Sequence, residues 1–195
     1  MGETKRDPRT IAASNGVASD RPFRAVVPPL YLTSTFGFEG FERNLGHEYT
    51  RTSNPTRDLL AETLAKLEGG AGAVVTSSGM AAVDLVLSTL RPHDLVVAPH
   101  DCYGGTYRLL AARRDRQQFD VAFVDQGDEA ATGAALRRKP KLVLVETPSN
   151  PLMRVVDIRA IAERARETGA RLAVDNTFLS PALQQPIALG ADFVI

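Results

Sequence analysis

The stretch DLVVAPHDCYGGTYRLLAARRD, residues 94–115, decides the fold class of this chain. Residues 95–98 are apolar on consecutive positions, which is typical of a strand that is buried on both faces. Gly104 and Gly105 follow a short polar stretch, and the residues after them favour a helix. A short apolar strand followed by a helix is the unit from which parallel sheets are built.

The same unit recurs along most of the chain. Strands are expected at residues 71–76, 94–99, 120–125, 141–146, 171–175 and 191–195. Helices are expected at residues 55–68, 79–90, 104–115, 128–138 and 156–168. The alternation predicts an α/β protein with a mostly parallel sheet and right-handed crossovers. Helices should cover both faces of this sheet.

The first 55 residues do not follow this pattern. They mix Pro, Gly, Ser and Thr with aromatic residues and show no sustained periodicity. A segment of this length is rarely a plain loop in a compact domain. We therefore predict an N-terminal arm, residues 1–55, that contacts a partner subunit, followed by a large domain that begins at residue 56.

Composition excludes several classes of function. Of the 195 residues, 44% are hydrophobic and 24% charged, as in a globular protein, and 23 Lys and Arg balance 23 Asp and Glu. This balance gives no electrostatic reason to expect nucleic acid or a membrane surface as partner, and no apolar stretch predicts a signal peptide or a membrane span. Cys102 is the single cysteine, which excludes an internal disulfide and fits a cytoplasmic location. With only three histidines beside it, no metal site is expected.

Polar residues gather where the expected strands end, and ligands of open parallel sheets bind at that edge. TSSGM, residues 76–80, opens a helix, where backbone N–H groups and hydroxyls suit an anion such as phosphate. An ordinary N-cap with a turn glycine is the alternative. The sequence contains no Walker P-loop and no G-x-S-x-G nucleophile elbow. EGGAG at 68–72 precedes an expected strand instead of following one, so it is not a Rossmann fingerprint. Nucleotide-binding and serine-hydrolase functions are therefore not supported.

Several single residues allow two interpretations each. Asp175 ends an apolar strand, where it could cap a turn or hold a cationic partner such as a protonated pyridine nitrogen. Tyr103 could stack on a planar ring or cover the sheet edge. His100 and Cys102 are only two residues apart, which disfavours a nucleophilic Cys–His pair. From their local sequence, Arg108 and the arginine of the YTR motif at 49–51 are expected to be solvated surface residues.

Six blocks in order resemble one known family. They are VVPPLYLTSTF, HEYTRTSNPTRDLLAETLAKLEGG, TSSGMAAV, APHDCYGGTYRL, VETPSNPLMRVVDI and VDNTFLSPALQQPIALGADFVI. Together they are similar to the pyridoxal-phosphate enzymes of cysteine and methionine metabolism, and most of all to bacterial members that synthesise cystathionine. The resemblance covers residues 10–195. It implies fold type I, the aspartate-aminotransferase-like fold, with residues 56–195 forming part of the pyridoxal-phosphate-binding domain.

The resemblance implies how the cofactor phosphate would be held. Ser78, Gly79 and Met80 would bind it through backbone and hydroxyl groups. Tyr49 and Arg51 would reach the phosphate in the neighbouring subunit's site. The family therefore implies a homodimer with shared active sites, and its members are usually homotetramers.

The resemblance also assigns residues to the cofactor ring. Tyr103, the catalytic candidate within this chain, would stack on the pyridine ring. Asp175 would pair with the ring nitrogen, Thr177 would support the ring from beneath, and Asn150 would lie near the phenolic oxygen.

The implied reaction is a γ-replacement on an amino acid. The thiol of cysteine would displace the acyl group of O-succinyl- or O-acetyl-L-homoserine and give L-cystathionine, a step of methionine biosynthesis. Arg108 would bind a substrate carboxylate, and Glu48 would lie at the substrate entrance.

One departure from the family pattern concerns the lysine that forms the Schiff base with the cofactor. In the family it follows the strand that matches residues 191–195, so we expect it beyond Ile195. None of Lys5, Lys66, Lys139 and Lys141 matches its position. The C-terminal domain of the family is absent as well. We expect the 195-residue chain alone to be inactive.

Other activities remain open from the sequence. Cystathionine γ-lyases and homoserine-ester sulfhydrylases of the same family share nearly all of the blocks. Methionine γ-lyases commonly carry Cys where this chain has Gly105, which argues against that activity. A non-catalytic binding or assembly module is a more distant alternative.

Overall fold

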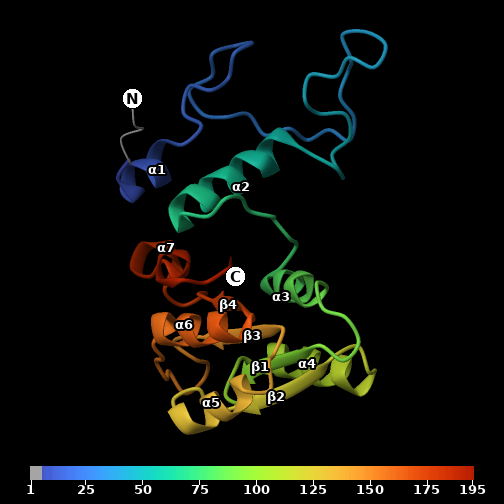
Figure 1. The fold of residues 1–195 in the computed structure, drawn as a ribbon. Coiled ribbons are helices and arrows are strands. Elements are labelled where there is room, and N and C mark those ends of the chain that lie inside the picture. The colour runs from blue at the N-terminus through green and yellow to red at the C-terminus, as the bar shows by residue number, and fades with distance from the viewer. Residues whose placement is uncertain (1–5) are drawn as a thin grey trace. The chain divides into compact units, whose positions relative to one another are not determined.

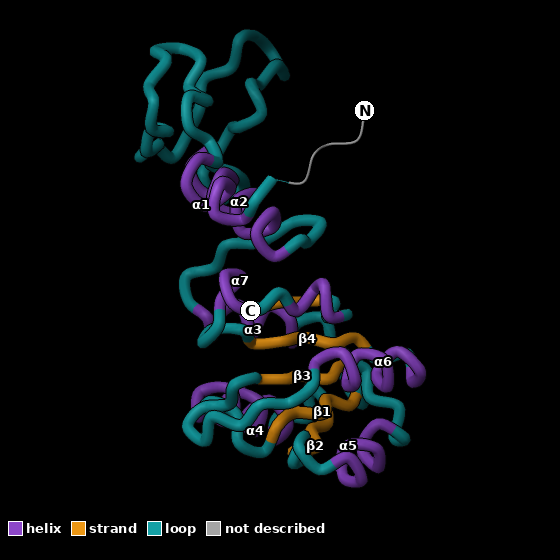
Figure 2. The backbone as a smooth tube through the Cα atoms, turned by 90° about the vertical axis from the view of Figure 1, so that its left-hand side faces the viewer, coloured by secondary structure: helices purple, strands orange, loops and turns teal. Residues whose placement is uncertain are grey.

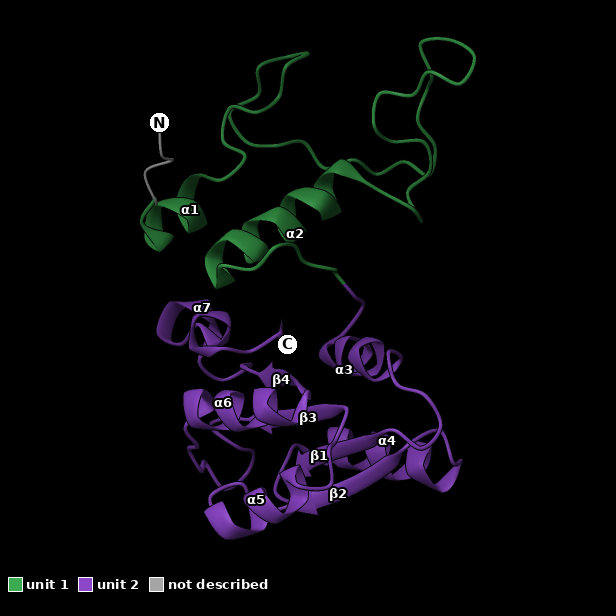
Figure 3. Cartoon of the chain, in the orientation of Figure 1, with its two compact units in different colours: residues 1–75 green, residues 76–195 purple. Residues whose placement is uncertain are grey.

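The computed structural model describes residues 6–195, so Lys5 and the beginning of the predicted arm lie outside the described residues. The chain divides into two compact units, Met1–Val75 and Thr76–Ile195 (Figure 3). Each unit has its own internal packing and is described by itself. Among residues 6–195, no helix combines the length and the apolar character that a membrane crossing requires.

The second unit is built on a five-stranded parallel sheet. Its order is β2-β1-β3-β4-β5 (Figure 1). The strands are β1 (Leu95–Pro99), β2 (Asp120–Val124), β3 (Leu142–Glu146), β4 (Arg171–Asp175) and β5 (Phe193–Val194). All four neighbouring pairs are parallel. The predicted α/β class with a parallel sheet is confirmed.

Helices connect these strands and cover both faces of the sheet (Figures 1 and 2). They are α3 (Gly79–Leu87), α4 (Gly104–Asp115), α5 (Glu129–Leu136), α6 (Ile158–Thr168), the short α7 (Ser180–Leu183) and a 3-10 turn at Pro186–Leu189. Side-chain caps start several of them, because Asp128 and Asp157 accept hydrogen bonds from backbone N–H groups in the first turns of α5 and α6. The helix predicted at 104–115 matches α4 at both ends.

Alternate residues of each strand enter two separate hydrophobic cores. On β3, Leu142 and Leu144 pack in the core that α3 and α4 cover, whereas Val143 and Val145 pack in the core under α5 and α6. This division follows from the two-residue period of side chains along a strand. Because both faces are buried, the strand sequences are continuously apolar.

One predicted strand is wrong. Residues 71–76 form no strand, and Val74 remains 73% exposed. The segment is apolar enough for a strand, but no described segment pairs with it, and a strand needs a partner for its backbone groups. The strand predicted at 191–195 is shortened to the two residues of β5.

The first unit consists of two helices and long irregular segments. Helix α1 (Pro8–Ser14) was not predicted; it begins where the Asp7 carboxylate accepts from the N–H of Arg9. Helix α2 (Pro55–Glu68) matches its prediction, since Asn54 caps its start and Gly69, at φ 73°, ends it. The two helices pack together within this unit.

Candidate active site

A pocket of about 330 Å³ lies at the carboxyl ends of the strands in the second unit. This volume is within the range of roughly 300–1,000 Å³ that small-molecule sites occupy. Its lining comes from α3, α4 and the loops after β3 and β4. The lining residues are Ser78, Gly79, Met80, Val83, Tyr103, Thr106, Glu146, Pro148, Asn150, Asp175, Thr177 and Phe178. Seven predicted site residues of this unit therefore meet in one cavity.

Strand register places two carboxylates side by side in this pocket. β3 and β4 are paired so that Glu146 lies opposite Asp175. Both positions continue the alternation that directs Leu144 and Ala173 toward α3 and α4. The two acids therefore face the same side of the sheet as the helices that complete the pocket.

The start of α3 supplies an anion-binding edge. Ser78 caps the helix, and its hydroxyl accepts from the N–H of Ala81 at 3.2 Å. By their position, the N–H groups of Gly79 and Met80 have no acceptor within the helix. An exposed glycine leaves room beside these donors, because a Cβ added at Gly79 would have no neighbour within 4 Å. The partial positive charge of these N–H groups and the open space beside them suit a phosphate group.

The end of β4 holds its carboxylate in a fixed position. Asp175 Oδ1 accepts from the Thr177 hydroxyl at 2.6 Å and from the Thr177 N–H at 3.0 Å. Both residues line the pocket. The turn after the strand thus orients the Asp175 side chain while leaving its second oxygen for another partner.

Tyr103 stands at the N-terminus of α4 and remains 46% exposed. Its ring approaches Gly105 closely, since a Cβ added there would lie 2.5 Å from Tyr103 Cε1 and 3.0 Å from Met80 Sδ. A side chain at position 105 would therefore require the Tyr103 ring or the Met80 side chain to shift from its present place. A flat, half-exposed aromatic ring at a pocket wall can stack on a planar ligand.

Glu146, which the sequence reasoning did not select, is a buried acid of the pocket. Its two oxygens accept from the N–H of Tyr103 at 2.8 Å and of Asn150 at 2.7 Å. Burial raises the pKa of Glu146 above its ordinary value, and the charges of Asp175 and Asp101 add to this, while the two N–H groups oppose it. The only feature of the sequence that could have selected Glu146 is its place as a single acid at the end of a buried strand.

The nearby thiol is protonated at neutral pH. Burial raises the pKa of Cys102 to about 12, and the Glu146 carboxylate adds to the shift. A thiol with so high a pKa is a poor nucleophile, because the thiolate is the reactive form. The geometry thus supports the sequence argument against a Cys102–His100 pair.

Thr106 is a second pocket residue that the sequence reasoning missed. Its side chain is 2% exposed, and its hydroxyl has no hydrogen-bond partner among residues 6–195. Buried hydroxyls are normally paired, so an unpaired one in a residue that lines a pocket is an unusual feature of this site. Nothing in the local sequence distinguishes this threonine from an ordinary helix residue.

The predicted residues of the first unit form a cluster of their own. The Thr35–Tyr49 bridge and the hydrogen bond from the Phe36 N–H to the Glu48 carbonyl align two irregular segments. The Arg51 guanidinium lies over the Tyr49 ring, 5.1 Å from its centre. Tyr49 and Arg51 thus stand together, as a shared ligand would require.

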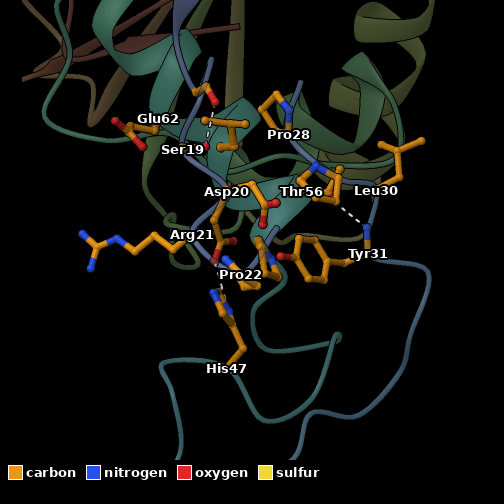
Figure 4. Close-up of a pocket in the computed structure, with 15 residues that line it drawn as sticks. Ser19, Asp20, Arg21, Pro22, Pro28, Leu30, Tyr31, His47, Thr56 and Glu62 are labelled. Carbon is orange, nitrogen blue, oxygen red and sulfur yellow. Dashed lines mark hydrogen bonds and ion pairs between the residues drawn. The ribbon is translucent and has the colours of Figure 1, made fainter. Parts of the chain in front are cut away.

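The larger cavity of the first unit, about 690 Å³, is not where these residues lie. Figure 4 shows its wall, in which the Thr56 hydroxyl accepts from the N–H of Tyr31 and Arg21 extends away. His47 reaches the carboxylate of Asp58 at 3.7 Å. Glu48, Tyr49 and Arg51 are not among the residues that line this cavity.

Arg108 and the lysines lie outside the lining of the 330 Å³ pocket. Arg108 is exposed on α4, one turn after Tyr103. Lys139 and Lys141 precede β3 at the amino ends of the strands, and Lys66 is paired with Glu62 on α2. Within residues 6–195, no group of three or more His, Cys, Asp or Glu side chains could hold a metal ion.

Comparison with known proteins identifies the family of this chain. The sequence matches the family described as Cys/Met metabolism PLP-dependent enzymes over residues 9–195. The chain belongs to this family. Its members depend on pyridoxal phosphate, and the observed cavity fits that group. The α3 N-terminus suits the phosphate, and Asp175 suits a ring cation.

This member of the Cys/Met metabolism family has relatives of known activity. It is 58% identical to cystathionine γ-synthase of Escherichia coli K12 over 191 residues, which are 97% of this chain and 50% of that protein. It is 38% identical to cystathionine γ-lyase of Bacillus subtilis 168, over 96% of this chain and 49% of that protein. The chain spans about half the length of the curated relatives that it matches.

A solved structure shares the fold at high similarity. Cystathionine γ-synthase from Xanthomonas oryzae pv. oryzae, in complex with cystathionine, superposes with a TM-score of 0.96 at 50% identity. The match covers 98% of this chain and 50% of that one. The fold type I expectation is confirmed by this similarity.

Proposed function

We propose that the protein is a pyridoxal-phosphate-dependent cystathionine γ-synthase. It would join the cysteine thiol to Cγ of O-succinyl- or O-acetyl-L-homoserine, giving L-cystathionine and releasing the acyl group as its carboxylate. The observation that carries the proposal is the convergence of Ser78, Tyr103, Asn150 and Asp175 on one pocket in a chain 58% identical to such an enzyme.

The phosphate would be held at the N-terminus of α3. The N–H groups of Gly79 and Met80 and the Ser78 hydroxyl would donate hydrogen bonds to it. Tyr49 and Arg51 of a second subunit would add a hydroxyl and a bidentate cation. The stacked arrangement of Arg51 on Tyr49 supports a joint role for these two residues.

The ring would lie between Tyr103 and Thr177. Asp175, held by Thr177, would keep a proton on the ring nitrogen, and Asn150 would lie near the phenolic oxygen. When bound, pyridoxal phosphate supplies an electron sink for negative charge at the substrate carbons. The polar donors and acceptors around it would orient the amino acid and set the position of each proton.

The substrate would enter from the exposed side of the pocket. Arg108, an exposed residue of α4, would bind a substrate carboxylate, and Glu48 would lie near the entrance. The assembly would be a homodimer with shared sites, and two such dimers would form a homotetramer. An enzyme of methionine biosynthesis would act in the cytoplasm.

Substrate competition tests the proposal. The full-length holoenzyme should convert O-succinylhomoserine plus cysteine to cystathionine much faster than it cleaves cystathionine. Chromatographic product analysis distinguishes the two reactions, and sulfide in place of cysteine tests for sulfhydrylase activity. A large preference for cleavage would show that the protein is a lyase. The 38% identity to a γ-lyase is the reason for testing this alternative.

A further inference from the structure

Glu146 connects two loops that carry site residues. It is the last residue of β3, and its side chain lies at the pocket wall although the residue is only 8% exposed. One oxygen accepts from the N–H of Tyr103, in the loop between β1 and α4. The other accepts from the N–H of Asn150, in the loop between β3 and α6.

We propose that Glu146 is a positioning residue of the cofactor pocket, whose ionised carboxylate fixes the Tyr103 and Asn150 loops relative to each other. The identity of the ligand rests on the proposed function. The alignment of the two loops rests on the hydrogen bonds of Glu146 alone.

The chemistry of the carboxylate explains why an acid is needed at this position. An ionised carboxylate has two accepting oxygens and can serve two N–H groups, whereas glutamine or a protonated acid keeps one accepting oxygen and presents a donor at the other. A donor aimed at a backbone N–H repels it. Burying a negative charge beside Asp175 is costly, so this position is not one that packing alone would favour.

A second link joins the same two loops. The Ser149 hydroxyl donates to Asp101 Oδ2 at 2.7 Å and accepts from the N–H of Arg154 at 3.2 Å. Asp101 and Ser149 each precede a site residue by one or two positions. Glu146 and this pair therefore hold the β1–α4 loop at two places, Tyr103 and Asp101, on either side of Cys102.

The link through Glu146 should depend on pH. The groups that act on it are Asp175 from β4, Asp101 and the Cys102 thiol from the β1–α4 loop, and the N–H groups of Tyr103 and Asn150. Burial and, to a smaller extent, the charges of Asp175 and Asp101 raise the pKa of Glu146, and its second accepting oxygen is lost as the pH falls through that raised value. The link therefore weakens on acidification.

The test compares Glu146→Gln with the wild type in the full-length protein. Apo-protein is titrated with pyridoxal phosphate, and the dissociation constant is measured by fluorescence from pH 8 downwards. At pH 8 the variant should bind about tenfold more weakly, as expected for one lost hydrogen bond to a charged group. The ratio of the two dissociation constants should shrink toward one as the pH falls, because the wild-type acid becomes protonated.

A control and a second variant make the outcome unambiguous. Glu163→Gln, on the exposed face of α6, should bind like the wild type at every pH. If Glu146→Gln does not fold, Ser149→Ala tests the second link, and it should weaken cofactor binding about threefold or more and speed hydrogen exchange of the Tyr103 and Asn150 amides.

Two results separate the proposals. A wild type that binds pyridoxal phosphate, with a variant ratio of one at pH 8 or a ratio that does not change with pH, would overturn the role of Glu146 and leave the proposed function intact. A wild type that binds no pyridoxal phosphate would overturn the proposed function. In that case, unchanged amide exchange at Tyr103 and Asn150 in Glu146→Gln would overturn the alignment of the loops as well.

Discussion

The two units of this chain use their apolar residues in opposite ways. In the second unit, β3 and its neighbours bury nearly every apolar side chain in one of two cores. In the first unit, Phe23, Leu32 and Phe41 are each more than 90% exposed, and helix α2 contains no buried residue. Exposed apolar surface of this kind supports our prediction that the first unit contacts a partner subunit. The second unit is stabilised by its own core, whereas we predict that a partner covers the first.

Truncation of a leucine side chain should reveal the largest difference between the two units, measured as the loss in free energy of unfolding. Leu172 lies on β4 in the core under α5 and α6 and is 1% exposed, so Leu172→Ala should lower the free energy of unfolding by about 2–5 kcal/mol. The matched change Leu64→Ala, on α2 at 39% exposure, should cost less than about 1 kcal/mol in the dissociated subunit. Urea unfolding measures both values. Equal losses would show that α2 is part of a core after all.

Mixing two inactive variants tests whether the two units of one chain contribute to the active sites of different subunits. Asp175→Asn and Arg51→Ala should each lower turnover by about 10²–10³-fold, because each removes a charge that we propose faces the cofactor. If the first unit serves a partner's pocket, mixed dimers contain one intact site, and random pairing should restore about a quarter of wild-type activity. Asp115→Asn on the exposed end of α4 is the control. Failure to restore activity after subunit exchange would place both residues in the same subunit's site.

Polar substitutions on the exposed surface of the first unit should weaken assembly. Leu32→Ser and Phe41→Ser should each weaken self-association by about tenfold, since buried interface apolar residues commonly contribute more than about 1 kcal/mol. Leu183→Ser, at 77% exposure on α7 of the second unit, is the matched control. Sedimentation velocity across a concentration series gives the association constants. Equal effects of all three changes would remove the distinction between the units.

A methyl group at Gly105 should have the smallest effect, and that effect should be confined to the second unit. Gly105→Ala would push the Tyr103 ring aside and weaken pyridoxal-phosphate binding by about tenfold or less. Gly72→Ala, where an added Cβ meets nothing within 4 Å, should leave binding unchanged. Titration of the apo-proteins gives both constants, and a wild-type value for Gly105→Ala would mean that the ring moves freely.

The periodic parts of the fold were predictable because local sequence determines them. Strands β1 to β4 are consecutive apolar runs, and α2 has a cap, a proline and a terminal glycine in the expected places. Residues 71–76 have the same apolar character yet form no strand, because pairing depends on a partner distant in sequence. Helices α1 and α7 are too short to show a period.

The site was predictable only in part. Family motifs selected Ser78, Tyr103 and Asp175, which the structure brings to one pocket. Glu146 and Thr106 were missed because their importance lies in burial and in contacts 43 residues apart, as between Glu146 and Tyr103. Such contacts leave no trace in local sequence. We still predict that three residues of the first unit lie at a partner subunit's site: Glu48, Tyr49 and Arg51.

The pairing of Glu146 opposite Asp175 has a consequence for how this sequence can change in length. The connection between the two strands can gain or lose a residue without altering which positions of the strands pair, provided that the change falls after Asn150 and outside α6. A single insertion within β4, by contrast, would move Asp175 by one step and turn it to the opposite face of the sheet. Length variation among natural and designed versions of this domain should therefore accumulate in the connections and be absent from Leu142–Glu146 and Arg171–Asp175.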